Sequence, residues 1–257
     1  LMAAAKKIDG NIQVNVASLI GHNSLRSAVM GRDAARAATK AEIDSMRKLV
    51  PRAMKAGALG VSVGLGYFPG SYAERSEVVA LGRLAAADSG LLNFHIRDEG
   101  VDGVVALKEA LGDIKRAKVR GHISHFKAAG RSQWRSIEKR LRLLDSDGEI
   151  GIDVYPYEAS STDLSPLLPQ WALALTPEQL RRRLANPKAR IALREEMTVK
   201  LERAGWIDYG FVQVASFWTQ RDYDGRYVPE IAASRSARNR ASLADQQELL
   251  ISMAERG

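Results

Sequence analysis

Two histidines end two predicted strands at matching positions, 30 residues apart in the chain. His95 lies in the apolar run LLNFHI, and His125 follows the run KVRGHIS. Because neighbouring strand ends lie about 5 Å apart in a sheet, both imidazoles could reach one Zn²⁺ at roughly 2.0–2.1 Å. Bound zinc polarises a carbonyl and lowers the pKa of water. The spacing leaves two interpretations open, a metal or catalytic site and two ordinary polar residues at loop junctions.

The other two histidines are weaker candidates. Side chains alternate across a strand, so in KVRGHISH the side chains of Ile123 and His125 should share one face and His122 the other. We therefore predict that His122 faces a covering helix and has a structural role. His22 also follows an apolar run, and we expect either a functional role or packing and loop hydrogen bonds.

Composition limits the classes of protein. The chain has 257 residues, of which 46% are hydrophobic and 26% charged, enough for one large α/β domain or two small ones. It has no cysteine, which excludes disulfides, Cys-ligated zinc and a thiol nucleophile. This composition fits a reducing compartment, and we expect a cytoplasmic location. No apolar run approaches the roughly 20 residues that span a bilayer, so no membrane partner is expected.

The formal net charge of +8 raises the question of nucleic acid. The basic residues concentrate in Arg181–Arg183 and in residues 234–240, and neither stretch has interleaved aromatic residues. Single-strand binders usually stack bases on such aromatics. The interpretation as solvated surface is therefore favoured over a basic nucleic-acid-binding module, and no nucleic-acid partner is expected.

Apolar runs alternate with helical patterns along the chain. Helices are predicted at 41–56, 75–89, 101–117, 134–145 and 242–255, and residues 225–241 look irregular. Residues 164–205 read as a helical insertion, with Thr176 and Asn186 as N-caps. The predicted strands are residues 12–20, 59–65, 91–96, 118–124, 149–157 and 210–216.

This alternation predicts a parallel sheet covered by helices. Four of the predicted strands recur about every 30 residues, the length of one βα unit. A closed (β/α)8 barrel needs eight strands, so a count of six is short. We predict an α/β fold of the (β/α)8 TIM-barrel type, incomplete with about six strands. Residues 1–257 would form a single partial domain, with 164–205 inserted in it.

Several unlike motifs occur together in one order. They are NVASLIGHNSLR (15–26), KAGALGVSVGLGYFPGSYA (55–73), FHIRDEG (94–100), ISHFKAAGRSQW (123–134) and DVYPYEASSTDLSPLLPQWA (153–172). Together they resemble the D-aminoacylase family, the N-acyl-D-amino-acid deacylases of the amidohydrolase superfamily. The resemblance spans roughly residues 12–205.

The resemblance implies a zinc-dependent barrel hydrolase that cleaves the amide of N-acyl-D-amino acids. In that pattern His95 and His125 are metal ligands from adjacent strands. Lys127 and Tyr67 match residues that hold the substrate carboxylate, which suits a cation and a hydroxyl donor. Arg97 is a second candidate for contact with the anion.

Other parts of the family pattern are missing from this sequence. It has no His-x-His pair and no bridging Cys, and its one SDG string, at 146–148, falls between a helix and a strand rather than after a last strand. We therefore expect no general-base Asp, weak zinc binding and no turnover by the chain alone. The alternative is a non-enzymatic truncated or split-gene fragment that needs a complementary chain or an oligomer.

Overall fold

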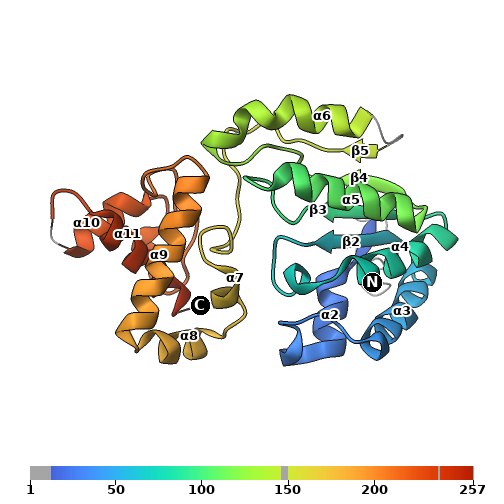
Figure 1. The fold of residues 1–257 in the computed structure, drawn as a ribbon, viewed down its shortest axis with the longest axis horizontal. Coiled ribbons are helices and arrows are strands. Elements are labelled where there is room, and N and C mark those ends of the chain that lie inside the picture. Colours follow the sequence, from blue (N-terminus) through green and yellow to red (C-terminus); the bar gives the residue numbers. More distant parts are fainter. Residues whose placement is uncertain (1–12, 146–149, 237, 257) are drawn as a thin grey trace. The chain divides into compact units, whose positions relative to one another are not determined.

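A computed structural model describes residues 13–145, 150–236 and 238–256 (Figure 1). Within these ranges the chain divides into two compact units. The first holds residues up to 129 together with 133–156, and the second holds 130–132 and the residues from 157 onward. The predicted single domain with an insertion at 164–205 stays a prediction, because this division does not decide which unit is an insertion. In the described ranges, no helix has the length and apolarity needed to cross a membrane.

The first unit is built on a parallel sheet whose strands follow one another in chain order, β1-β2-β3-β4-β5. The strands are β1 (Ser18–Gly21), β2 (Ala58–Gly64), β3 (Leu91–His95), β4 (Arg120–Ile123) and β5 (Ile150–Ile152). Each strand pairs in parallel with the next, as βα units require. Over the described residues this is an open five-stranded sheet, as expected of an incomplete barrel.

Helices connect the strands, and all of them except α2 lie at predicted places. They are α2 (His22–Met30), α3 (Lys40–Lys55), α4 (Arg75–Ala87), α5 (Gly103–Ala117) and α6 (Ile137–Asp145), with short 3-10 turns η1 (Gly31–Asp33), η2 (Gly70–Tyr72) and η3 (Arg131–Ser136). Thr39 caps α3 in a capping box with Glu42, and Pro51 lies within that helix. Helix α4 packs against α3 and α5 (Figure 1).

Alternate residues of the sheet face these helices and form the core. Leu92, Phe94 and Ile123 are buried. A side chain at Gly121 would overlap Ile114 of α5, so β4 can approach that helix closely only because residue 121 is glycine. The opposite face of β3 and β4 carries the polar residues in between, and this is the face that matters for the site.

The second unit is helical. It contains α7 (Gln170–Leu173), α8 (Pro177–Leu184), α9 (Pro187–Arg203), η4 (Arg221–Tyr223), α10 (Val228–Ser236) and α11 (Leu243–Ala254). The predicted N-caps Thr176 and Asn186 are confirmed, and Ser242 caps α11. The buried core includes Leu193, Met197 and Tyr209.

Four predicted elements differ most from the structure. Residues 210–216 are not a strand, since only an isolated antiparallel bridge joins Gln213 to Tyr227. Residues 225–241, predicted irregular, contain α10. Its apolar face is short and is followed by Ser and Arg residues, so the helical pattern was not recognised. The first and fifth strands are shorter than predicted, and residues 12 and 149 of those predictions lie outside the described part of the chain. In the described part of the chain the sheet therefore has five strands rather than six.

Candidate metal centre

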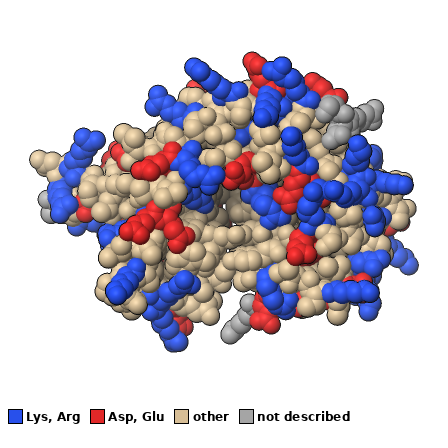
Figure 2. Space-filling model, in the orientation of Figure 1, with Lys and Arg blue, Asp and Glu red and all other residues tan. Residues whose placement is uncertain are grey.

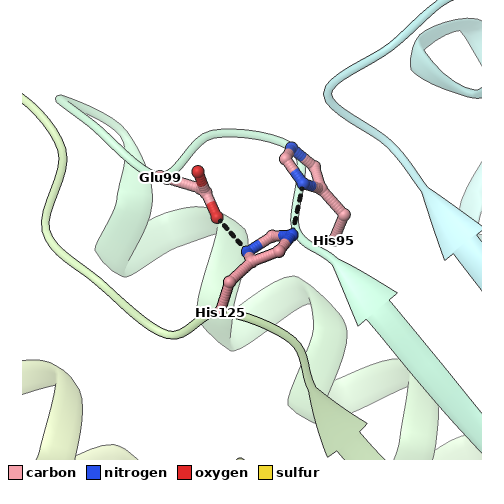
Figure 3. A group of neighbouring side chains, drawn as sticks. All are labelled: His95, Glu99 and His125. Atoms are coloured by element: carbon pink, nitrogen blue, oxygen red, sulfur yellow. Dashed lines mark hydrogen bonds and ion pairs between the residues drawn. The ribbon is translucent and has the colours of Figure 1, made fainter. Parts of the chain in front are cut away.

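The two histidines predicted to act together meet at the ends of β3 and β4 (Figure 3). The Nδ1 atom of His95 lies 3.0 Å from the Nε2 atom of His125. Their ring centroids are 4.8 Å apart, with the planes inclined by 71°. Two side chains 30 residues apart in sequence thus point their ring nitrogens at one place.

His125 reaches this position because the strand has already ended. Strand β4 stops at Ile123, and His125 has a φ of +40°, in the left-handed region. Its backbone N–H donates to Oδ1 of Asp153 at 2.6 Å, which holds the turn. The side chain therefore leaves the alternation of the strand and swings towards His95.

The prediction that His122 faces a helix is wrong. His122 pairs in register with Asn93 of β3, and its Nδ1 lies 2.9 Å from Oδ1 of that residue. The helix-facing positions of β4 are Gly121 and Ile123. His122 thus lies on the same face as His95, and the alternation rule failed because it was extended to His125, beyond the last residue of the strand.

A carboxylate that the sequence analysis missed completes the cluster. Oε1 of Glu99 lies 2.8 Å from Nδ1 of His125 (Figure 3), and Nζ of Lys127 donates to the same oxygen at 2.6 Å. Nζ also lies 3.0 Å from Nδ1 of His125. Within the described residues, His95, Glu99 and His125 form the one His/Asp/Glu group with ligand atoms all within 4.8 Å of one another. The available signal was an acid in the loop four residues after His95.

The electrostatics of the site suit a metal. Burial lowers the pKa of His95 to about 4; the Glu99 carboxylate opposes this shift, while His125 and Lys127 add to it. His95 is therefore neutral near pH 7, as a metal ligand must be. Two nitrogens on a tetrahedral zinc are about 3.3 Å apart for bonds near 2.05 Å, close to the observed 3.0 Å. The donor set fits zinc.

Tyr67 and Gly66 confine the ring of His95. The Tyr67 ring lies 4.5 Å from the His95 ring between centroids. A Cβ atom at Gly66 would lie 2.7 Å from Nε2 of His95, closer than real Cβ contacts. The glycine therefore lets the loop after β2 lie directly against the histidine ring.

Arg97, predicted as an anion contact, is engaged elsewhere. Its guanidinium pairs with Glu109 of α5 at 2.9 Å and donates to the carbonyls of Ser71 and Ala73 at 2.8 and 3.1 Å. The charge is already compensated by a carboxylate. Arg97 ties the loop after β2 to the loop after β3.

Arg140 of α6 connects the two loops that carry the cluster. It is buried, and its guanidinium donates to the carbonyls of Glu99, Lys127 and Gly100 at 2.6, 2.7 and 2.7 Å. A Cβ atom at Gly103 would overlap the guanidinium. One side chain thus fixes the backbone on both sides of the cluster, and no local sequence pattern pointed to it.

His22 lies in a different group. It is fully buried, and its Nε2 lies 2.6 Å from Oε1 of Glu77, whose other oxygen accepts from Arg26. Burial raises the pKa of Glu77, but hydrogen bonds and attraction from His22 and Arg26 outweigh it and hold that pKa below the ordinary value. Of the two readings of His22, the structure supports the packing role.

The concentrated basic stretches make contacts within the second unit. Arg183 lies over the Trp171 ring at 3.9 Å, Arg182 pairs with Glu178, and Arg238 pairs with Asp245. Figure 2 shows basic and acidic residues interspersed over the visible surface. These pairings are those of an ordinary solvated surface.

No family model matches the sequence, but individual known proteins are similar to it. D-aminoacylase of Alcaligenes xylosoxydans xylosoxydans is 38% identical over 154 residues, which are 59% of this chain and 32% of that protein. N-acyl-D-aspartate deacylase of the same organism is 34% identical over 207 residues, 76% of this chain and 41% of that protein. The chain thus spans a third to two fifths of the curated relatives it matches.

Solved structures agree. The crystal structure of N-acyl-D-glutamate deacylase from Bordetella bronchiseptica, complexed with zinc and a phosphonate inhibitor, is 28% identical with a TM-score of 0.73. The match covers 98% of this chain and 45% of that one. A D-aminoacylase structure that defines a subset of amidohydrolases is 26% identical with a TM-score of 0.63, covering 92% and 46%.

The parallel sheet, its helices and these neighbours define the first unit as part of an amidohydrolase-type (β/α) barrel. Within that class, the resemblance of this chain to the D-aminoacylase family is confirmed.

Proposed function

We propose that this chain supplies the His95–His125 part of a zinc centre that hydrolyses the amide bond of N-acyl-D-amino acids. The observation that carries the proposal is the 3.0 Å approach of His95 Nδ1 to His125 Nε2 at the ends of adjacent parallel strands. The names of the relatives support the reaction class, and the zinc complex of a similar deacylase supports the metal.

The residues of this chain would divide the work. Zinc, when bound, supplies a Lewis acid and an activated water. His95 and His125 would hold it as neutral imidazoles. Lys127 would bind the substrate carboxylate by a charge-assisted hydrogen bond, in competition with Glu99 for the same ammonium group. Tyr67, beside His95, would help to orient the substrate. Arg97 is given no role in substrate binding, because its guanidinium already forms an ion pair with Glu109.

We also propose that the 257-residue chain alone does not turn over. Two imidazoles are fewer than the three protein ligands usual in a catalytic zinc site, so zinc would be held weakly. A complementary chain or an oligomer that adds ligands, and a cytoplasmic location, stay predictions.

The test is zinc analysis of the purified chain after equilibration with metal. We expect zinc to bind to the wild-type chain and to be lost in His95→Ala and His125→Asn. The matched control is His122→Asn, which removes an imidazole from the same face of the sheet but leaves the cluster intact, and which should keep the zinc. Equal zinc contents in all four proteins would contradict the proposed site.

A second arm measures turnover with N-acetyl-D-glutamate, N-acetyl-D-aspartate and N-acetyl-D-methionine, with the L-enantiomers as controls. Stoichiometric zinc with release of D-amino acid would support a deacylase and refute the inactivity of the isolated chain. Absence of zinc in the wild-type chain would favour the alternative of a non-enzymatic fragment.

A further inference from the structure

Glu99 is a cluster residue that neither the sequence nor the family resemblance assigned. Its Oε1 atom contacts both Nδ1 of His125, at 2.8 Å, and Nζ of Lys127, at 2.6 Å. It therefore lies on the side of the His125 ring that is turned away from His95 (Figure 3). The question is what a carboxylate does there.

The two nitrogens of His125 have different surroundings. Nε2 faces His95, where the metal would be held, and Nδ1 faces a carboxylate and an ammonium group. A neutral imidazole that binds a metal through Nε2 must carry its proton on Nδ1, and this N–H needs an acceptor. An ammonium group has only donors, so Lys127 cannot serve. Glu99 can, since an ionised carboxylate only accepts.

The backbone that delivers this carboxylate is well fixed. Arg140 donates to the carbonyl of Glu99 and, on the other side of the cluster, to that of Lys127. The N–H of Ala129 donates to the Glu99 carbonyl as well, at 2.8 Å. The carboxylate and the ring it contacts are thus held on two loops joined through one buried guanidinium.

We propose that Glu99 is the positioning residue of the metal centre: its carboxylate accepts the Nδ1 proton of His125 and so presents Nε2 to the metal. This inference rests on the proposed function, because it deepens the role of the same site. The proposal also implies that Lys127 changes its hydrogen-bond partners. When Nδ1–H donates to Glu99, Lys127 can no longer donate to Nδ1, and its ammonium group is left with Glu99 and an incoming anion.

The first experiment measures the zinc affinity of the full chain by competition with a chromophoric chelator. Loss of an acceptor of this kind typically costs a factor of about 10–100 in metal affinity. We expect a loss of that size in Glu99→Ala and a smaller loss in Glu99→Gln, which keeps a carbonyl acceptor. The matched control is Glu138→Gln, which removes one exposed carboxylate of α6 and should leave the affinity unchanged. An unchanged affinity in Glu99→Ala would overturn the proposal.

Cobalt in place of zinc distinguishes positioning from direct ligation. A positioning carboxylate leaves the ligand set intact, so the visible spectrum of the Co²⁺-loaded Glu99→Gln variant should match that of the wild type in band position and intensity. A changed spectrum would show that Glu99 is itself a ligand, and the proposal would be wrong.

A third measurement does not depend on metal. The ¹⁵N chemical shifts of His125 in the metal-free chain report which ring nitrogen carries the proton. We expect the Nδ1–H form in the wild type and a shift towards the Nε2–H form in Glu99→Ala, where Lys127 donates to Nδ1. The same form in both proteins would overturn the role of Glu99. If the wild-type chain binds no zinc, the proposed function fails while this measurement still decides the inference.

Discussion

The first unit contains two groups with almost the same residue types, one fully buried and the other partly exposed. Each joins a histidine, a glutamate and a cation: His22 with Glu77 and Arg26, and His125 with Glu99 and Lys127. The first group is fully buried. In the second, the side chains of His125 and Lys127 are 30% and 23% exposed. Residue types alone therefore do not distinguish a structural group from a functional one.

The two groups differ in the hydrogen-bond partners of their remaining ring nitrogens and of the cation. Arg26 also donates to the carbonyls of Ala34 and Arg36, and Nδ1 of His22 is buried without a hydrogen-bond partner among the described residues. That group is enclosed by protein. In the other group the second ring nitrogen of His125 points at a second imidazole at a strand end. A metal can bind where one ring nitrogen of a histidine faces a second histidine and the other ring nitrogen has a hydrogen-bond partner.

The comparison predicts the largest effect for Glu77→Gln. Removing one partner from a buried ionic group leaves uncompensated charge and costs roughly 3–5 kcal/mol. The partly exposed Glu99→Gln should lower the free energy of unfolding by less than about 1 kcal/mol. Urea unfolding of both variants checks this. Similar losses in the two would remove the distinction between the groups.

Arg140→Met comes next. The substitution removes a buried guanidinium that serves three carbonyls, and unsatisfied buried acceptors cost about 1–3 kcal/mol each before relaxation, so we expect a net loss of roughly 3 kcal/mol. Zinc affinity should fall in parallel, because the Glu99 and Lys127 loops lose their common anchor. Arg142→Met, an exposed neighbour on α6, is the control for both readouts. Full retention of zinc affinity would show that Arg140 supports the fold only.

The buried group around His22 and the surroundings of His125, which include the neighbouring His95, should also respond differently to acid. The pKa of folded His95 is about 4 against an ordinary value of 6.5, so between these values the unfolded chain binds a proton that the folded chain does not. The free energy of unfolding should therefore fall as the pH drops from about 6.5 to about 4, by an amount on the order of 2 kcal/mol. Glu77 has a lowered pKa, and its contribution is lost only as the pH falls below its ordinary value of 4.5.

Stability measured against pH in the wild type and in His95→Asn separates these contributions. The variant should lack the decline between about 6.5 and 4 and keep the decline at lower pH. A variant curve parallel to that of the wild type throughout would mean that His95 titrates normally.

The smallest expected effect on the fold is that of Gly66→Ala. The added methyl group would press on the far end of the His95 ring, which can rotate away, so stability should change by less than about 1 kcal/mol. Zinc affinity should drop about tenfold, because the ligand ring is displaced. Gly64→Ala, where the nearest atom is 3.3 Å away, is the control. Equal zinc affinities in both variants would show that the loop yields before the ring does.

The sequence predicted those features that local rules determine. Capping signals located the helices at Thr39, Thr176 and Asn186, and matched strand ends located His95 and His125. The sequence did not predict features that depend on contacts between distant residues. Glu99 and Arg140 act through residues 28 and 41 positions away, and their local sequence does not identify those partners, although its place four residues after His95 was a signal for Glu99 itself. The strand predicted at 210–216 has suitable residue types but only one bridge.

The left-handed backbone of His125 has a practical consequence for mutagenesis. Asparagine adopts positive φ angles several-fold more readily than most residues, whereas a β-branched residue there is a true outlier. Replacing His125 by asparagine should therefore delete the imidazole while leaving the turn relaxed, and valine at the same place would strain the chain. Experiments that ask what this one ring contributes should choose the former, so that a missing ligand is not confused with a distorted loop.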